Sequence, residues 1–523
     1  MEIRNRQFSV QNALFIIIAL LLSACAIGTP KPTPTRPLAF VTVTPTPPPT
    51  ATPLPPAEDF SLYRAAMRPA FADDVNRLAE RGITRYTIRA AIQPVSDKNI
   101  GAKITGTLRA EYTNTEPVLL NQIFFRLLPN TPAYGGSMRV SAVTVDGLPV
   151  RTELLANDTT LSVTLPQTLK SGETVTIALQ FSATAPNTTR YGYGLLGAED
   201  GVLALANFYP VITVFDEAGW HIEVLPPYGD ATYTDVALYD VTLTAPQEMT
   251  IVTSGDVLTH TVSADSAQTV RAATGPMRDF FVAMSANFQQ AQTQTDDVTV
   301  TAFYPAGYES AGKWMLDVAA NALTIYQQLF GTYPYRSFDV VAVPMPAELG
   351  GVEFPGVIAM ARRYYEQPSD LEEFVVAHEV AHQWWYGLVG NDQVNAPWLD
   401  EALTQYSAVL YFEQRYGAQT HQNLVDTYFW YPYNQLLATG ADRPAAAAVN
   451  RYSEAAYSGV VYGKAPLFFE EVRQQLGDDR FFQGLRLYAD SHRYGIAKPA
   501  DLLDAFEQVS GQDLIAVYQK WIQ

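Results

Sequence analysis

The strongest constraint on the fold of this chain is the spacing of two histidines, His378 and His382. Residues four apart lie on one face of a helix, so these two side chains can act together only if the segment is helical. The flanking sequence predicts this helix. Ser369, with Glu372 three residues later, forms a capping-box pattern, and an apolar run follows until Gly387 ends it.

A second helix is predicted over residues 397–416, with a proline in its first turn and Gly417 as its stop. It would carry Glu401, which antiparallel packing can bring against the first helix. Two imidazole nitrogens and one carboxylate are the ligand set of a catalytic zinc ion, which keeps a fourth position for water. We therefore predict that His378, His382 and Glu401 bind one zinc ion.

Glu379 follows the first histidine but points about a hundred degrees around the helix from it. It can therefore face a zinc-bound water without binding the metal, as a general base must. The alternative is a solvated helix with two incidental histidines, which the downstream glutamate on its own predicted helix disfavours. The remaining histidines lack such partners and are interpreted as surface or core residues: His221, His260, His421 and His492.

Four segments resemble the aminopeptidase N family of gluzincin zinc metallopeptidases, which includes the leukotriene hydrolase. Two of them are residues 376–385, around His-Glu-Val-Ala-His, and residues 397–401, Pro-Trp-Leu-Asp-Glu. Residues 350–354, Gly-Gly-Val-Glu-Phe, resemble the family's exopeptidase loop, which is usually Gly-Ala-Met-Glu-Asn. Residues 456–464 resemble the stretch that holds its catalytic tyrosine. The resemblance runs from about Tyr86 to the C-terminus.

The resemblance implies a zinc-dependent metallopeptidase that acts as an aminopeptidase, with Glu379 as its general base. It also implies that Tyr462 is catalytic. A phenol near the scissile carbonyl can donate a hydrogen bond that strengthens as the oxygen becomes anionic. Only the resemblance distinguishes Tyr462 from the neighbouring Tyr457.

Glu353 lies between two stretches predicted as strands, residues 338–345 and 354–360. An unpaired strand edge there could hold an extended peptide, and a carboxylate at its end could pair with a free α-ammonium. The resemblance makes Glu353, Gly350 and Gly351 the substrate-binding residues. The alternative is that Glu353 is an exposed acidic residue of a loop.

The chain also departs from the family pattern. Val352 and Phe354 stand where the exopeptidase loop has methionine and asparagine. Family aminopeptidases place a glutamate or glutamine of the β-domain on the substrate amine, and residues 201–210 offer neither, which leaves Glu199 and Asp200 as candidates. The alternatives are therefore a zinc endopeptidase, a hydrolase of another small substrate, or a surface-binding lipoprotein with a vestigial zincin fold.

The first residues predict where the protein resides. Arg4 and Arg6 precede a short apolar segment, residues 13–22, as in a secretory signal. The following Leu-Ser-Ala-Cys ends at Cys25 and resembles a bacterial lipoprotein cleavage box. We expect a signal peptide over residues 1–25 and a lipidated Cys25 that anchors the protein on the extracytoplasmic side of the cell envelope. The alternative is a permanent membrane anchor.

The rest of the chain divides by composition. Residues 26–57 are rich in proline and threonine and predict an extended linker. Residues 58–288, after a short helical lead-in, alternate in short apolar runs and predict an antiparallel, β-sandwich-like domain. Residues 289–523 predict a helix-rich domain around a small sheet, and the family resemblance implies that it is a catalytic domain of the thermolysin-like zincin type. The fold class is therefore multidomain α+β.

The chain carries a formal net charge of −19. Such a charge argues against binding to nucleic acid, whose phosphates require a basic surface. The expected partners are peptide substrates and, through Cys25, the membrane.

Overall fold

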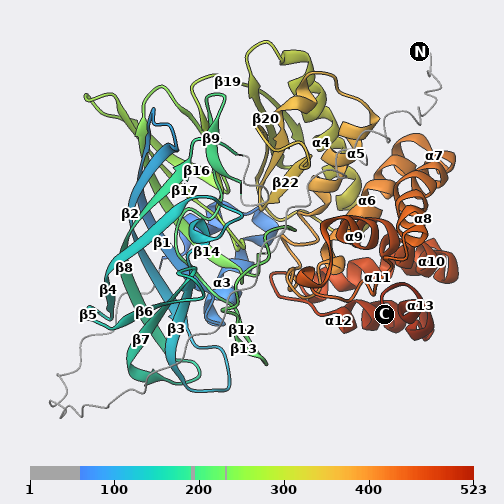
Figure 1. Cartoon of the computed structure of the whole chain (residues 1–523), viewed down its shortest axis with the longest axis horizontal. Helices are drawn as coiled ribbons and strands as arrows, with labels where there is room; N and C mark the ends of the chain where they lie inside the picture. Colours follow the sequence, from blue (N-terminus) through green and yellow to red (C-terminus); the bar gives the residue numbers. More distant parts are fainter. Residues whose placement is uncertain (1–58, 190–194, 230–231) are drawn as a thin grey trace. The chain divides into compact units, whose positions relative to one another are not determined.

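The computed structural model describes residues 59–189, 195–229 and 232–523. Residues 61–523 form one compact unit, in which strands dominate the first part and helices the second (Figure 1). The predicted α+β fold class is confirmed. Cys25 and the predicted linker lie outside the described residues. No helix in the described part of the chain combines the length and apolar character needed to cross a membrane.

The predicted helical lead-in comprises α2 (Ser61–Ala65), the short helix η2 (Pro69–Phe71) and α3 (Ala72–Glu80). An eight-stranded sheet follows, in the order β16-β17-β14-β1-β2-β8-β4-β5. Its strands are β1 (Thr84–Pro94), β2 (Ile100–Thr113), β4 (Ser137–Val145), β5 (Leu148–Pro149), β8 (Thr174–Pro186), β14 (Ala237–Pro246), β16 (Asp256–Val262) and β17 (Ala267–Ala273).

One pair in this sheet corrects the antiparallel expectation, because β1 and β14 run parallel. The other neighbours in the sheet are antiparallel. More than a hundred residues separate β1 from β14. Such a long connection can return the chain in the same direction, which a tight hairpin cannot.

Smaller sheets cover the inner face of the large one, and apolar residues of both form a common core. One four-stranded sheet has the order β15-β18-β10-β9 and another the order β11-β3-β7-β6, and β12 pairs with β13. Their bounds are β3 (Leu120–Arg126), β6 (Thr152–Leu155), β7 (Thr160–Leu169), β9 (Leu196–Glu199), β10 (Val202–Leu205), β11 (Val211–Ile212), β12 (Phe215–Asp216), β13 (Gly219–Trp220), β15 (Thr250–Thr253) and β18 (Val282–Ser285), with η3 (Leu128–Asn130) after β3.

A five-stranded sheet links the β-rich part to the helices and has the order β19-β20-β21-β23-β22. Its strands are β19 (Phe288–Thr295), β20 (Val298–Pro305), β21 (Ser337–Val343), β22 (Gly351–Phe354) and β23 (Val357–Ala361). The last strand, β22, is antiparallel to β23 and forms one edge. The domain boundary predicted at residue 288 coincides with the start of this sheet and stays a prediction.

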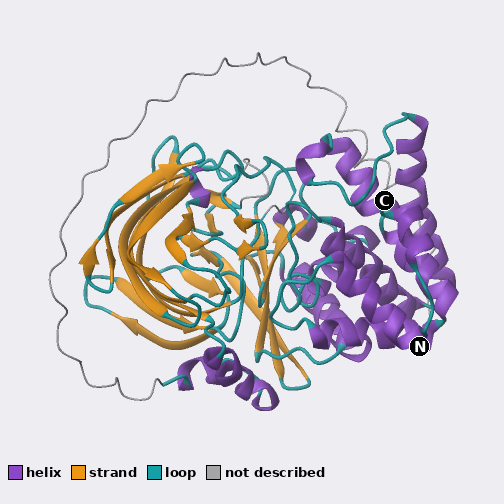
Figure 2. Ribbon diagram, turned by 90° about the horizontal axis from the view of Figure 1, so that it is seen from below, coloured by secondary structure: helices purple, strands orange, loops and turns teal. Residues whose placement is uncertain are grey.

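The helices from α4 onward gather on one side of the strands (Figure 2). They are α4 (Glu309–Phe330), η4 (Arg362–Tyr365), α5 (Asp370–Ala381), α6 (Trp398–Tyr416), α7 (Ala418–Leu424), η5 (Val425–Trp430), α8 (Tyr431–Ala438), η6 (Val449–Arg451), α9 (Glu454–Tyr457), η7 (Ser458–Lys464), α10 (Pro466–Leu476), α11 (Asp478–Ser491), α12 (Pro499–Ser510) and α13 (Ile515–Trp521). Both η5 and η7 are wide π-helical turns, a form that often occurs at functional sites.

The two helices predicted to carry the metal ligands are α5 and α6. Ser369 caps α5, and its side chain accepts a hydrogen bond from the backbone of Leu371. The helix ends at Ala381, earlier than the glycine signal predicted. After it the backbone bonds span five residues, as from the Gly387 N–H to the His382 carbonyl, which widens the turn.

Candidate metal centre and active site

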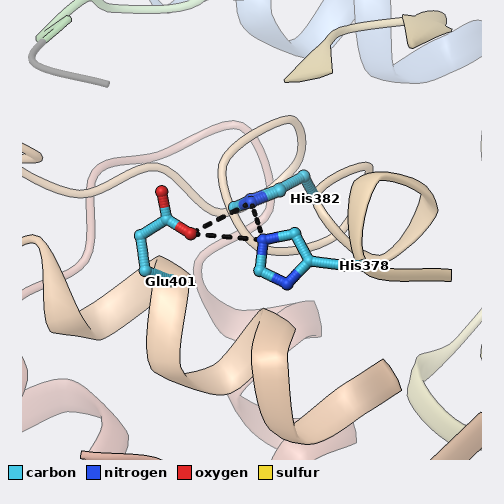
Figure 3. A group of neighbouring side chains, drawn as sticks. All are labelled: His378, His382 and Glu401. Carbon is cyan, nitrogen blue, oxygen red and sulfur yellow. Dashed lines mark hydrogen bonds and ion pairs between the residues drawn. The ribbon is translucent and has the colours of Figure 1, made fainter. Parts of the chain in front are cut away.

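Helices α5 and α6 pack together and bring His378, His382 and Glu401 to one point (Figure 3). The Nε2 atoms of the two histidines lie 3.2 Å apart. Glu401 Oε2 lies 3.3 Å from His378 Nε2 and 3.5 Å from His382 Nε2. All three side chains are buried. The sequence spacing therefore becomes a compact set of three donor atoms.

This geometry fits a zinc ion. Ligands about 2.0–2.2 Å from a tetrahedral zinc are separated from one another by about 3.3–3.6 Å, close to the observed separations. Glu401 Oε2 is buried without a hydrogen-bond donor among the described residues, and a cation would satisfy it. Two imidazoles and one carboxylate leave a fourth position for water, as in catalytic rather than structural zinc sites.

Neighbours outside this trio orient His382. Its Nδ1 atom lies 2.9 Å from the backbone oxygen of Trp385 and 3.2 Å from Thr404 Oγ1. A proton on Nδ1 can be donated to the Trp385 oxygen, which leaves Nε2 free to bind a metal. The turn after α5 thus places that carbonyl within hydrogen-bond distance of Nδ1.

A polar chain links Glu401 to Glu353. The Glu401 backbone N–H donates to Asp400 Oδ1 at 2.9 Å, and Gln393 Nε2 donates to Asp400 Oδ2 at 2.7 Å. The same Gln393 amide lies 3.4 Å from Glu353 Oε1. Neither Asp400 nor Gln393 was singled out from the sequence. The position of Asp400 beside a predicted ligand was the only available signal.

Glu379 lies beside this trio, as predicted from the helix geometry. Its carboxylate belongs to a second group of ligand atoms, with Glu353 and His382, that lie within 4.8 Å of one another. Burial raises the pKa of Glu379 well above its usual value, and it raises the pKa of Glu353 to about 7. Burial acts on Glu401 in the same direction, but the adjacent His378 and His382 imidazoles outweigh it and lower its pKa.

Gly350 and Gly351, at the start of β22, allow α5 to approach the strand. A Cβ on Gly351 would lie 2.5 Å from Glu379 Cγ, and a Cβ on Gly350 would lie 2.7 Å from the Tyr364 hydroxyl. Both distances are far below van der Waals contact. The structure thus gives these residues a steric role next to the candidate base, and their predicted contact with substrate stays a prediction.

Glu353 lies within β22 rather than between two strands, which corrects the loop interpretation. Its side chain is only 6% exposed, so the alternative of an exposed acidic loop residue is wrong. Gln383, just after α5, holds the end of the strand. Its Nε2 donates to the Phe354 carbonyl at 3.0 Å, and its Oε1 accepts from the Gly356 N–H at 2.8 Å.

The two candidate tyrosines lie on α9 and η7 and have different neighbours. The ring of Tyr462 packs against His378, with centroids 6.0 Å apart. The ring of Tyr457 contacts those of Tyr228 and Tyr452, at 6.0 and 5.8 Å. The structure therefore places Tyr462, and not Tyr457, against a predicted ligand, although the two rings also contact each other.

A small recess opens beside Glu353, and we call it the Glu353 recess. Asn207, Asp279 and Tyr386 line it together with Glu353. The two acidic candidates named from the sequence have other partners. Glu199 accepts hydrogen bonds from the backbone and side chain of Thr189, and Asp200 pairs with Arg362 at 2.7 Å.

Asn207 was therefore missed, although it lies in the stretch, residues 201–210, that the resemblance picked out. It follows β10 with a positive φ of 47°. Its amide is buried. The nitrogen donates to the Tyr134 hydroxyl at 2.9 Å, and the oxygen has no donor among the described residues. The side-chain oxygen of an asparagine can accept a hydrogen bond as that of a glutamine does. Considering asparagine together with glutamate and glutamine would therefore have singled out Asn207.

Comparisons with known proteins agree with this architecture. Residues 314–521 match the model of the peptidase family M1 domain. Aminopeptidase 2 of Candida albicans is 27% identical over 245 residues, which are 43% of this chain and 25% of that protein. Aminopeptidase N of Streptomyces lividans is 24% identical over 224 residues, 40% of this chain and 26% of that protein. The chain thus covers about a quarter of each of these two curated relatives.

Among solved structures, the M1 zinc metallopeptidase of Deinococcus radiodurans is similar, with a TM-score of 0.63 and 21% identity. The alignment covers 84% of this chain and 93% of that one. A mutant of the Deinococcus radiodurans enzyme bound to a Tyr-Ser-Ala substrate is also similar, with a TM-score of 0.63, 19% identity, and 84% and 94% coverage. These structures share the fold over most of the described residues.

Proposed function

We propose that this chain is a zinc-dependent aminopeptidase, because residues 314–521 match the peptidase family M1 domain and similar proteins are aminopeptidases. The observation that carries the proposal is the convergence of two buried histidines and a glutamate beside two further carboxylates, Glu379 and Glu353. The first group fits the metal, and the second offers a base and an anchor for a substrate amine.

In the proposed reaction, a zinc ion held by His378, His382 and Glu401 would polarise the scissile carbonyl and acidify the attacking water. Glu379 accepts the proton of that water and passes it to the departing amine, as a general base and then a general acid. Tyr462 donates a hydrogen bond to the carbonyl oxygen as its negative charge develops.

The specificity for free N-termini rests on Glu353. Its carboxylate stands on an edge strand, where an extended peptide can add main-chain hydrogen bonds, and within 4.8 Å of the Glu379 carboxylate. We assign a second acceptor for the α-ammonium to the Asn207 side-chain oxygen, which is buried and has no donor in the described part of the chain. Two acceptors on an ammonium favour it over an acetylated amine, which carries a single N–H.

The test compares cleavage of one peptide series with free and N-acetylated ends, each with and without a chelator. The proposal expects trimming of free peptides only, loss of activity on chelation, and recovery on adding zinc. Cleavage of blocked peptides at internal bonds, as fast as trimming of free ones, would instead support a zinc endopeptidase.

We further propose that the protein is a lipoprotein of the bacterial cell envelope, anchored through Cys25. Support comes from the sequence alone. Cys25 is the only cysteine of the chain and ends a lipoprotein-like box after an apolar segment. Cys25→Ala should abolish labelling by a fatty acid and release the protein from the membrane fraction. Retention of an uncleaved Cys25→Ala protein in that fraction would indicate a permanent membrane anchor instead.

A further inference from the structure

The Glu353 recess is lined by apolar residues and by buried polar ones. Ala133, Leu225 and Pro226 are half-buried, and we call them its rim. Asp279 and Asn207 are only 4% and 3% exposed, and we call them its floor. The volume of the recess is ≈ 40 Å³, which holds on the order of one to three water-sized groups. A space of this size suits a small polar head, while the alkyl chain that carries the head lies along the half-buried apolar residues.

The floor of the recess has more acceptors than donors. The Tyr386 hydroxyl donates to Asp279 Oδ2, and the Thr232 hydroxyl donates to Gln393 at 2.8 Å. Asp279 Oδ1 and the Asn207 oxygen remain buried with no donor among the described residues. A buried acceptor without a donor costs about 1–3 kcal/mol, and more when it is charged. The floor is therefore complementary to a group that brings N–H donors.

The guanidinium of Arg278, next to Asp279 in the sequence, does not supply donors to these acceptors. Arg278 is fully buried, and its guanidinium donates to backbone carbonyls of Thr234 at 2.9 Å and Tyr386 at 2.6 Å, and to that of Gly495. These bonds direct the guanidinium toward the backbone. No hydrogen bond or ion pair joins Arg278 to the Asp279 carboxylate in the described part of the chain.

We infer that the recess binds the cationic side chain of the first residue of a substrate, with Asp279 as the specificity-determining residue. The inference rests on the proposed aminopeptidase function. It names the substrate class as peptides that begin with lysine or arginine. The alkyl part of such a side chain lies along the apolar rim, and its charged head reaches Asp279.

Glu353 and Asp279 divide the two positive charges of such a substrate. Glu353 belongs to the group whose ligand atoms lie within 4.8 Å of one another around His382, and Asp279 does not belong to it. The carboxylate nearer the metal ligands therefore takes the α-ammonium, which is fixed close to the scissile bond. The carboxylate on the floor takes the charge at the far end of the side chain.

The test measures kcat/KM for two peptides that differ only in their first residue, lysine or norleucine. Norleucine has the same alkyl chain without the ammonium, so the lysine-to-norleucine ratio isolates the charge. We expect the wild type to favour lysine, and Asp279→Asn to lower the ratio by about 10- to 100-fold, the usual value of a charge-assisted hydrogen bond. Asp339→Asn, in β21 and outside the recess, is the matched control and should keep the wild-type ratio.

Three results would overturn the inference. The wild type could show no preference for lysine, which needs no variant and holds even if Asp279→Asn fails to fold. Asp279→Asn could leave kcat/KM for both peptides at the wild-type values. It could also lower both values by the same factor and so keep the ratio, which would place Asp279 on the α-ammonium. If neither free peptide is trimmed by zinc-loaded wild type, the proposed function fails first, and the two failures are thus distinguishable.

Discussion

The active site has two walls whose polar groups are satisfied in different ways. The metal wall, α5 and α6, carries His378, His382 and Glu401, whose donor atoms converge on one point. The substrate wall, formed by β22 and the residues around the Glu353 recess, leaves acceptors of Asn207 and Asp279 without donors among the described residues. The first wall is organised to hold one ion of fixed geometry. The second is organised to receive N–H groups that a substrate brings.

The largest expected effect tests the metal wall. Alanine at His378, His382 or Glu401 should remove most bound zinc and abolish activity, because each contributes one of three donors. Metal analysis of the purified variants checks this result. Stoichiometric zinc in all three variants would refute the ligand assignment.

The next effect separates metal binding from catalysis within the same wall. Glu379→Gln should keep zinc, since Glu379 lies outside the convergent trio, and should lower kcat by about 10²- to 10⁴-fold for want of a base. Zinc content and kcat are measured on one preparation. A variant that loses its zinc would make Glu379 a ligand and not a base.

A smaller loss of activity is expected for Tyr462 of η7, whose ring packs against His378 of the metal wall. Tyr462→Phe should keep zinc and lower kcat by about 10²- to 10³-fold, because the phenol acts on the developing oxyanion. Tyr457→Phe is the matched control, since its ring contacts Tyr228 and Tyr452. The opposite ranking of the two variants would move the catalytic role to Tyr457.

The substrate wall should respond through binding. Glu353→Ala should weaken the binding of the transition state of free-amine peptides by about 1.5–3 kcal/mol, the value of a hydrogen bond to a charged group. The kcat/KM for these peptides should fall accordingly. N-acetylated peptides lack the ammonium and should be poor substrates for both proteins. An equal loss for free and blocked peptides would show that Glu353 supports the metal wall instead.

The smallest effect concerns the contact between the walls. Gly351→Ala would place a Cβ 2.5 Å from Glu379 Cγ, and overpacking of this kind costs about 1–3 kcal/mol. We expect a lower melting temperature and a reduced kcat with retained zinc. Gly307→Ala, where a Cβ meets no atom within 4 Å, is a control for stability, although its φ of +91° adds backbone strain. A Gly351→Ala protein with wild-type kcat would show that the Glu379 side chain relocates freely.

Local patterns predicted the metal wall in detail. The capping residue Ser369, the start and stop of α6, and the spacing of the histidines are properties of short segments. Helical geometry converts such segments into positions in space. The fold class followed from alternating and helical runs in the same way, except that the parallel pairing of β1 and β14 depends on a long connection.

The sequence by itself determined which groups can hold the metal, because His378 and His382 lie on one helix face and Glu401 lies in the first turn of the next helix. Only the tertiary structure decided the substrate wall. Asn207, Asp279 and Glu353 are far apart in sequence, and they meet because β10, the segment before β18 and β22 pack around one recess. No periodic pattern within a short segment of the sequence predicts that these three residues lie together. Whether an acceptor is left without a donor depends on every neighbour that the fold supplies.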